Sequence, residues 1–261
     1  MNVAYHLRQL GLTPYLVSAV GCDLLGDELL RRIRGWGMDT DGIARHPARS
    51  TGYVRALLGA GGDARYEIAT GVAWDEITLG EHTVRQTQQA AALVFGSLAL
   101  RTPANRAVLA CVLAALPEGA WRVFDVNLRP PYDDLGLVRE LAAQATLLKM
   151  NSAEAARLGV ATGDELCARH LAEQTGCPTV CVTAGARGAG LLQAGRWYWE
   201  PARPVAVVDT VGAGDAFLAA LLASQLAGAA PERALARACR LGAFVAGCAG
   251  ATPVHPAAMA D

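Results

Sequence analysis

The chain has 261 residues, of which 52% are apolar and 18% are charged, and its 23 basic and 24 acidic side chains leave a formal net charge of −1. This much apolar material excludes a disordered chain, and the balanced charge gives no basic footprint for nucleic acid or for an anionic membrane surface. The first residues lack the apolar core of a signal peptide, and the longest apolar stretch, residues 216–230, is too short to span a bilayer. We therefore expect a cytoplasmic protein without nucleic-acid or membrane partners, folded as a single domain over residues 1–261.

Short apolar runs alternate with segments of helical periodicity. The first helix is predicted over residues 3–10, with Gly11 as its stop. Five strands are predicted at residues 15–20, 91–95, 122–126, 145–150 and 179–183. Further helices are predicted at residues 24–36, at 102–116, after a capping box of Thr162 and Glu165, at 215–227 and at 231–247. Because nearly continuous apolar strands are typical of burial on both faces, the pattern predicts an α/β fold with a mostly parallel central sheet flanked by helices.

One segment breaks this alternation. Residues 51–70 contain two runs of strand character around a Gly-Gly-Asp turn, which predicts a β-hairpin projecting from the sheet. Such a hairpin is either a lid over a binding site or an ornament without function.

The seven cysteines and five histidines show no spacing typical of a metal site. We expect the cysteines to be small buried apolar residues of a protein in a reducing compartment, and we expect no histidine-based metal site.

The segment with the clearest chemistry is residues 205–217, where an apolar strand is predicted to enter a glycine-rich turn that opens a long apolar helix. The backbone amides of Gly212, Ala213 and Gly214 would then face an anion at a helix N-terminus, where amides lack intrahelical partners. Asp215 stands at the edge of this site. A carboxylate there repels an anion, so it is either a simple helix cap or a base that accepts a proton from an attacking hydroxyl.

The sequence Asp-Thr-Val-Gly-Ala-Gly-Asp-Ala-Phe at residues 209–217 resembles the signature of the PfkB/ribokinase-like carbohydrate kinases. Four other stretches resemble motifs of that family in the same order: residues 20–26, 51–52, 149–154 and 182–188. The resemblance therefore spans essentially the whole chain. Residues 73–75, 95–101 and 124–130 are most similar to the fructokinase branch. The last of these also resembles 2-keto-3-deoxygluconate kinases, which carry a tryptophan where this chain has Tyr132.

The resemblance implies a ribokinase-like layered sandwich with a small β lid at about residues 51–70. It implies ATP-dependent phosphorylation of a sugar hydroxyl, with fructose as the first candidate and 2-keto-3-deoxygluconate or another sugar as the alternative. Its implied cofactors are ATP and Mg²⁺, with K⁺ as a further candidate, and its lid implies a homodimer. From other classes, a non-catalytic sugar- or nucleotide-binding protein and a nicotinamide-dependent dehydrogenase remain as competing hypotheses.

The same resemblance implies roles for individual residues. Asp215 would be the base, and Gly212, Ala213 and Gly214 would hold the transferring phosphoryl group. Asn151, Thr183, Gly185 and Gly188 would bind the nucleotide and its Mg²⁺, and Glu154 would contact Mg²⁺ through water. The sugar would contact Asn2, Asp125, Asn127 and Arg129. A monovalent cation would be held by Asp209 with backbone oxygens of Val211, Val245, Cys248 and Gly250.

Several of these residues also have plain structural explanations. Asn151 and Glu154 fit a capping box at the start of a helix, and the glycines at 185 and 188 fit an ordinary strand-exit turn. Arg129 fits an ion pair with a neighbouring carboxylate.

The resemblance lacks one part. Family members begin with a strand that carries a sugar-binding aspartate, a lid strand and a Gly-Gly motif that ends in asparagine, whereas here Met1 directly precedes Asn2. We expect a misassigned start rather than a genuine truncation, and we expect the absence of that strand to leave unpaired strand edges.

Overall fold

The computed structural model describes residues 1–58, 64–159 and 162–259. Its contacts divide the chain into two compact units, which we describe separately. The larger unit contains residues 1–14, 90–98 and 118–261, and the smaller unit contains residues 15–89 and 99–117.

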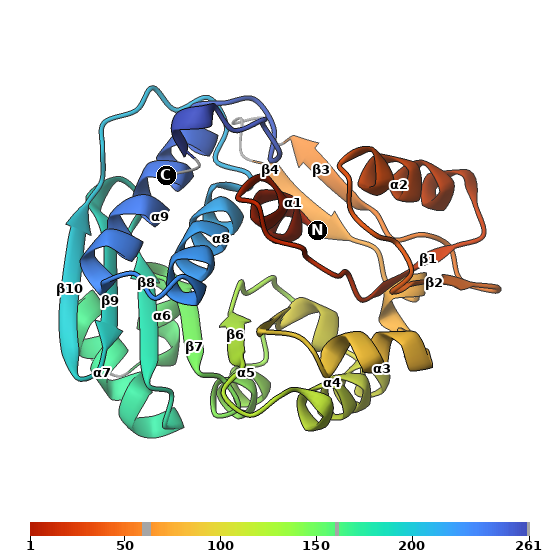
Figure 1. The fold of residues 1–261 in the computed structure, drawn as a ribbon, viewed down its shortest axis with the longest axis horizontal. Coiled ribbons are helices and arrows are strands. Elements are labelled where there is room, and N and C mark those ends of the chain that lie inside the picture. The colour runs from red at the N-terminus through yellow and green to blue at the C-terminus, as the bar shows by residue number, and fades with distance from the viewer. Residues whose placement is uncertain (59–63, 160–161, 260–261) are drawn as a thin grey trace. The chain divides into compact units, whose positions relative to one another are not determined.

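The larger unit is built on a six-stranded sheet with the strand order β10-β9-β8-β7-β6-β5 (Figure 1). The strands are β5 (Ala92–Gly96), β6 (Trp121–Asp125), β7 (Leu147–Asn151), β8 (Thr179–Thr183), β9 (Gly188–Gln193) and β10 (Arg196–Pro201). Strands β5 to β8 run parallel, while β9 and β10 add an antiparallel edge. The predicted mostly parallel sheet flanked by helices is therefore confirmed, and the antiparallel edge is an addition that the sequence pattern did not indicate.

Three helices share the main core of this unit: α1 (Asn2–Gln9), α8 (Ala213–Leu226) and α9 (Pro231–Ala246). Helix α8 is apolar on all sides, and its residues 216–225 are all buried. A helix of that kind has no face suited to water, so it is enclosed by the sheet, α1 and α9. The other α-helices among the described residues of this unit are α5 (Leu135–Ala142), α6 (Ser152–Leu158) and α7 (Asp164–Thr175).

The smaller unit holds two short sheets. Strands β1 (Ser18–Gly21) and β2 (Ile43–His46) pair in parallel, and β3 (Val54–Leu58) and β4 (Ala64–Ile68) pair in antiparallel fashion. This second pair lies where a hairpin was predicted, whereas its Gly-Gly-Asp turn at residues 61–63 lies outside the described residues. The helices are α2 (Leu24–Gly35), α3 (Glu81–Thr87) and α4 (Pro103–Ala115).

The stretch at residues 20–26 has a structural explanation within the smaller unit. Asp23 precedes α2, and its Oδ1 accepts a hydrogen bond from the Gly26 amide at 2.8 Å. Its Oδ2 accepts one from the Thr51 amide at 2.8 Å, and the buried Thr51 hydroxyl accepts one from the Gly21 amide. The Thr51 hydroxyl in turn donates to Asp23 Oδ1 at 2.7 Å, and this bond is the largest cause that lowers the pKa of Asp23, followed by the bonds from the amides of Thr51 and Gly26. The motif therefore ties the start of α2 to the segment that leads into the hairpin.

Two predicted local structures are wrong. Residues 205–208 do not form a strand, because no neighbouring strand pairs with them. Instead, the amides of Val208 and Asp209 donate to the carbonyl of Ala246 at the end of α9. Thr162 does not cap α7 either, since Gly163 occupies the cap position and Glu165 forms an ion pair with Arg169.

The cysteines depart in part from the expectation of burial. Four of the seven are buried, but Cys22 and Cys111 are exposed, and all seven are free thiols. Burial raises the pKa of the Cys239 thiol to about 12, so this group is a small core residue and not a nucleophile at neutral pH.

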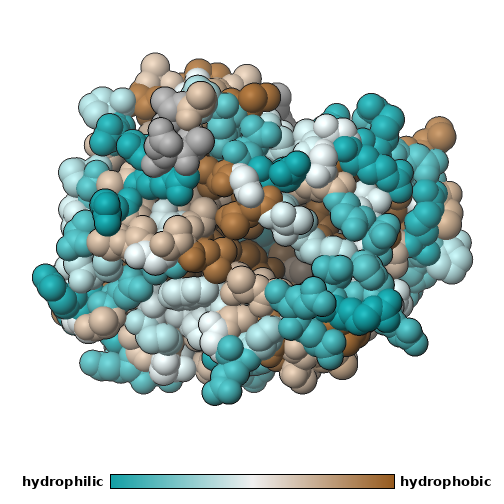
Figure 2. Space-filling view, in the orientation of Figure 1, coloured by the Kyte–Doolittle hydropathy of each residue, from teal (hydrophilic) through white to brown (hydrophobic). Residues whose placement is uncertain are grey.

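Hydrophilic residues cover much of the face shown in Figure 2, and hydrophobic residues gather in separate patches on it. Within residues 1–58, 64–159 and 162–259, no helix combines the length and the apolar character needed to cross a lipid bilayer.

Candidate active site

The start of α8 has the geometry of an anion-binding turn. Gly212 adopts a left-handed conformation at φ +83°, and a Cβ placed on it would lie 2.6–2.7 Å from atoms of Ala251. Only glycine fits there without displacing the backbone. The amide of Ala213 donates to the Thr210 carbonyl at 3.3 Å, whereas the amides of Gly214 and Asp215 find no acceptor among the described residues. These two amides, at the positive end of a 14-residue helix, are available to an anion.

Asp215 lies in the first turn of α8 and meets a residue from the other end of the chain. The Asn2 side-chain amide, at the first position of α1, donates to Asp215 Oδ2 at 2.9 Å. Oδ1 of Asp215 accepts no hydrogen bond from the described residues. Two of the predicted site residues thus touch, and the free oxygen is available to accept a proton.

A buried ion pair that the sequence interpretation missed lies beside this turn. Lys149 on β7 places its Nζ 3.0 Å from Asp125 Oδ1 at the end of β6, and both side chains are buried. The same ammonium lies 3.2 Å from the point where a Cβ on Gly214 would stand. The signal was present in the sequence, because Lys149 is the one charged residue in the mostly apolar run at residues 145–150.

Asn151 and Glu154 form the capping box that was the structural alternative for them. Asn151 Oδ1 accepts from the Glu154 amide, and Glu154 Oε2 accepts from the Asn151 amide, both at 2.9 Å. The other oxygen of Glu154 accepts from the Leu128 amide at 2.7 Å. Glu154 therefore fastens the loop after β6 to the start of α6. With both oxygens engaged by amides, it is suited to act on Mg²⁺ through water, so that role stays a prediction.

Three of the predicted sugar-binding residues lie at the end of β6 and in the loop that follows it. Asp125 is buried, and both of its oxygens lie within hydrogen-bond distance of Lys149 Nζ, so a contact of Asp125 with the sugar stays a prediction. Asn127, at φ +40°, turns the chain sharply. Arg129 is exposed, and its Nη1 donates to the carbonyl of Leu128 rather than to a carboxylate. The ion pair offered as its structural alternative does not form in the described part of the chain.

Thr183 is the last residue of β8 and lies opposite Asn151 in the sheet register, while Gly185 lies in the turn that follows and Gly188 begins β9. The Thr183 hydroxyl donates to the Met150 carbonyl at 3.3 Å, and the Ala184 amide donates to the Gly188 carbonyl at 2.8 Å. A Cβ on Gly188 would collide with the carbonyl oxygen of Glu200. The glycine at 188 is therefore required by the turn itself, and a role of this turn in nucleotide binding stays a prediction.

Several residues predicted to bind a monovalent cation lie together. The amides of Val211 and Gly250 donate to the two oxygens of Asp209, at 2.9 and 3.2 Å. The carbonyl of Val245 accepts from the Cys248 amide at 3.0 Å. These bonds hold the two loops together, and a cation at this point stays a prediction.

A pair of neighbouring histidines, His6 and His255, holds Ala251, the residue that lies against Gly212. His6 is fully buried in α1, and its Nε2 lies 3.0 Å from the Ala251 carbonyl oxygen. Its Nδ1 lies 2.9 Å from Nε2 of His255. If His6 donates to Ala251, then its Nδ1 accepts from His255, and both rings are neutral. Burial lowers the pKa of both rings, that of His255 to about 4.

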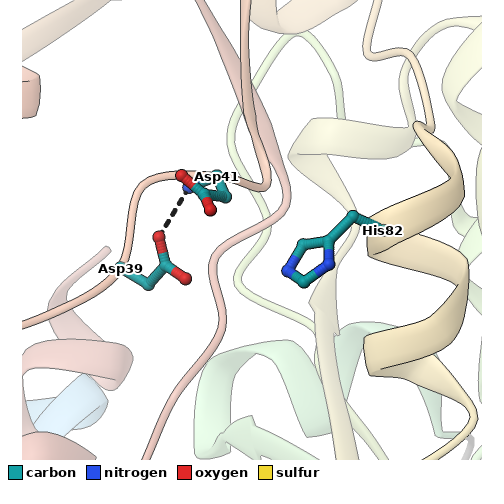
Figure 3. A group of neighbouring side chains, drawn as sticks. All are labelled: Asp39, Asp41 and His82. Carbon is teal, nitrogen blue, oxygen red and sulfur yellow. Dashed lines mark hydrogen bonds between the residues drawn. The ribbon is translucent and has the colours of Figure 1, made fainter.

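The smaller unit brings together one group of side chains whose spacing in the sequence gave no sign of a metal site. Asp39, Asp41 and His82 place their ligand atoms within 4.8 Å of one another, and His82 projects from α3 toward the loop that carries the aspartates (Figure 3). Both carboxylates are exposed, and Asp39 already accepts a hydrogen bond from the Asp41 amide. Exposed acidic groups at such spacing are common without an ion, so we assign no metal to them.

Comparison with known proteins agrees with this fold. The family model described as pfkB family carbohydrate kinase matches residues 1–258. A fructokinase from Rhizobium leguminosarum bv. trifolii is 29% identical over 236 residues, which cover 85% of this chain and 69% of the relative. A 2-dehydro-3-deoxygluconokinase from Thermoproteus tenax is 28% identical over 256 residues, covering 92% of this chain and 76% of the relative.

An uncharacterized sugar kinase from Pyrococcus horikoshii is similar in both sequence and structure. It is 29% identical over 223 residues, which cover 85% of this chain and 70% of the relative. Its crystal structure superimposes with a TM-score of 0.81 at 26% identity, over 96% of this chain and 82% of that one. A second crystal structure of the same kinase, in complex with ATP, superimposes with a TM-score of 0.79. With the family model matching nearly the whole length, the chain belongs to the PfkB family of carbohydrate kinases.

Proposed function

We propose that this kinase transfers the γ-phosphoryl group of ATP to a hydroxyl of a small sugar, with fructose as the preferred acceptor. The observation that carries the proposal is the start of α8. There the amides of Gly214 and Asp215, which donate to no acceptor among the described residues, lie next to the Asp215 carboxylate, whose Oδ1 accepts no hydrogen bond from the same part of the chain. Amides at that point stabilise negative charge on a phosphoryl group, and the carboxylate accepts the proton of the attacking hydroxyl.

The surrounding residues support these two roles, phosphoryl binding by the amides and proton acceptance by the carboxylate. Asn2 holds Asp215 Oδ2, which leaves Oδ1 as the oxygen that faces the hydroxyl proton. Glu154, with its two oxygens occupied by backbone amides, favours contact with Mg²⁺ through water. ATP supplies the phosphoryl group, and the metal offsets charge on the phosphates.

Two observations support fructose as the acceptor. The fructokinase from Rhizobium is among the similar proteins, and residues 73–75 and 95–101 are similar to the fructokinase branch. The second candidate acceptor is 2-keto-3-deoxygluconate. The exposed guanidinium of Arg129 favours it, because a guanidinium pairs well with the carboxylate that fructose lacks. A lid role for the hairpin at residues 51–70, and pairing of such hairpins in a homodimer, stay predictions.

The decisive test replaces Asp215 by asparagine. Asparagine has the same shape and keeps an oxygen for Asn2, but it accepts no proton, so kcat should fall by about 10³-fold or more while the fold is retained. ADP release is measured with fructose, 2-keto-3-deoxygluconate, ribose, fructose 6-phosphate and a nucleoside. Circular dichroism and thermal melting monitor the fold.

A matched control is Glu232→Gln, which removes a carboxylate from the first turn of the neighbouring helix α9. It should retain the wild-type rate. Turnover by Asp215→Asn at the wild-type rate would show that another group is the base. Binding of sugar and ATP without any turnover by the wild type would instead favour a non-catalytic protein.

A further inference from the structure

Lys149 is a charged residue in an unusual position. It stands in the middle of the sheet on β7, and only 9% of its side chain is exposed. Lysine is almost never buried unless it is paired, because burial of an ammonium group is costly. The sheet register places it directly opposite Asp125, and its Nζ lies 3.0 and 3.3 Å from the two carboxylate oxygens.

The Lys149 ammonium has surroundings other than Asp125. Nζ also lies 3.2 Å from the position of an absent Cβ on Gly214, so it reaches the underside of the first turn of α8. Burial alone would lower the pKa of Lys149. The negative charges of Asp125, Asp215 and Glu154 more than reverse this effect and raise the pKa. Lys149 is therefore cationic at neutral pH, with three carboxylates around it.

The charges around the first turn of α8 disfavour the binding of a nucleoside triphosphate unless the positive charge of Lys149 also acts at this turn. The three carboxylates repel a polyanionic triphosphate, and the amides of Gly214 and Asp215 carry only partial positive charges. A full charge in a poorly solvated position acts strongly over a few ångströms. Of the four ionisable side chains Lys149, Asp125, Asp215 and Glu154, Lys149 alone is basic. Its ammonium lies in such a poorly solvated position, next to Gly214.

We propose that Lys149 is a positioning residue for phosphoryl transfer, whose fixed positive charge acts through the first turn of α8 to make that turn a competent anion site. The proposal rests on the proposed kinase function and goes beyond the known motif residues. Lys149 is too buried to bind the phosphates as an exposed lysine would, so it acts through Gly214 and Asp215.

The competing explanation is that Lys149 only neutralises Asp125. The two explanations separate in the Asp125→Asn background, where the ion pair no longer exists. Lys149→Met adds the loss of the charge at nearly constant shape, and replacing both members of a buried pair is often tolerated in folding. The double variant D125N/K149M should therefore melt at or above the temperature at which D125N melts, because D125N alone leaves the buried ammonium without its partner, and D125N/K149Q serves as a second double variant if Met is not accommodated.

The experiment measures the binding of MgATP by calorimetry and kcat for the sugar that the panel selects. We expect D125N/K149M to bind MgATP at least 10-fold more weakly than D125N, and its kcat to be about 10–100-fold lower. Equal affinity and equal kcat in the two variants would overturn the proposal, because Lys149 would then be only the partner of Asp125.

The wild type separates this inference from the proposed function. A wild type that binds MgATP but phosphorylates no sugar of the panel contradicts the proposed reaction, while the affinity ratio between D125N/K149M and D125N still decides the role of Lys149. A wild type that fails to bind MgATP overturns both.

Discussion

The contact between Gly212 and Ala251 offers a quantitative test of the anion-binding turn. Replacing Gly212 by alanine places a methyl group where backbone atoms of Ala251 lie 2.6–2.7 Å away. The residue also has φ +83°, where an L-residue costs roughly 1–2 kcal/mol. Forcing the backbone to move adds about 1–3 kcal/mol. The total loss of unfolding free energy should therefore be roughly 2–5 kcal/mol.

Gly11 provides a matched control. It has the same φ of +83° after α1, but a Cβ on it would meet no atom within 4 Å. Gly11→Ala should therefore lose only the conformational part, about 1–2 kcal/mol, and should keep the wild-type rate. The difference between the two variants isolates the collision with Ala251.

The collision with Ala251 should also lower the catalytic rate. A displaced Gly212 moves the amides of Gly214 and Asp215, and loss of one such donor typically lowers kcat by about 10²–10³-fold. Urea denaturation gives the free energies, and the ADP-release assay gives kcat. If Gly212→Ala matches Gly11→Ala in both stability and rate, the close contact does not constrain the turn.

Two further predictions concern stability. Because burial lowers the pKa of His6, and that of His255 to about 4, the neutral rings favour the folded state above pH 6.5, and this stability is lost as the pH falls toward 4. Urea denaturation at pH 7 and pH 5 should show this loss, and His255→Gln should make it smaller; an unchanged pH dependence would exclude the pair as its source. Arg101 makes two 2.8 Å hydrogen bonds to the buried Asp75, so Arg101→Met should cost about 3–5 kcal/mol, whereas Arg31→Met in an exposed ion pair should cost under about 1 kcal/mol. Equal losses in these two variants would show that burial of the pair contributes nothing.

Local patterns predicted much of the fold. Strand β8 begins and ends at the predicted residues, and α4 begins at Pro103 with the Thr102 hydroxyl as its cap, as the sequence pattern indicates. Apolar runs and capping residues act over a few positions, so they leave a clear trace in the order of the amino acids. The glycine-rich turn before α8 is of the same kind.

Where an element needs a partner far along the chain, local patterns were insufficient. Residues 205–208 are as apolar as a strand, yet no strand pairs with them. The antiparallel strands β9 and β10 have small or mixed residues that resemble no buried parallel strand, and only their pairing to β8 defines them. Strand structure is completed by hydrogen bonds to another segment, so apolar character alone does not decide it.

The composition and motifs of this chain suffice to place Asp215 and the glycines of the α8 turn near one another, because they are consecutive residues at a helix start. Only the folded chain brings Asn2 to Asp215, which is 213 positions away, and only the sheet register sets Lys149 opposite Asp125. The pairing of His6 with His255, across 249 positions, is of the same kind. Hydrogen bonds and charge act over a few ångströms of space, whatever the separation along the chain, so the groups that hold this site together emerge only when the sheet and its helices assemble.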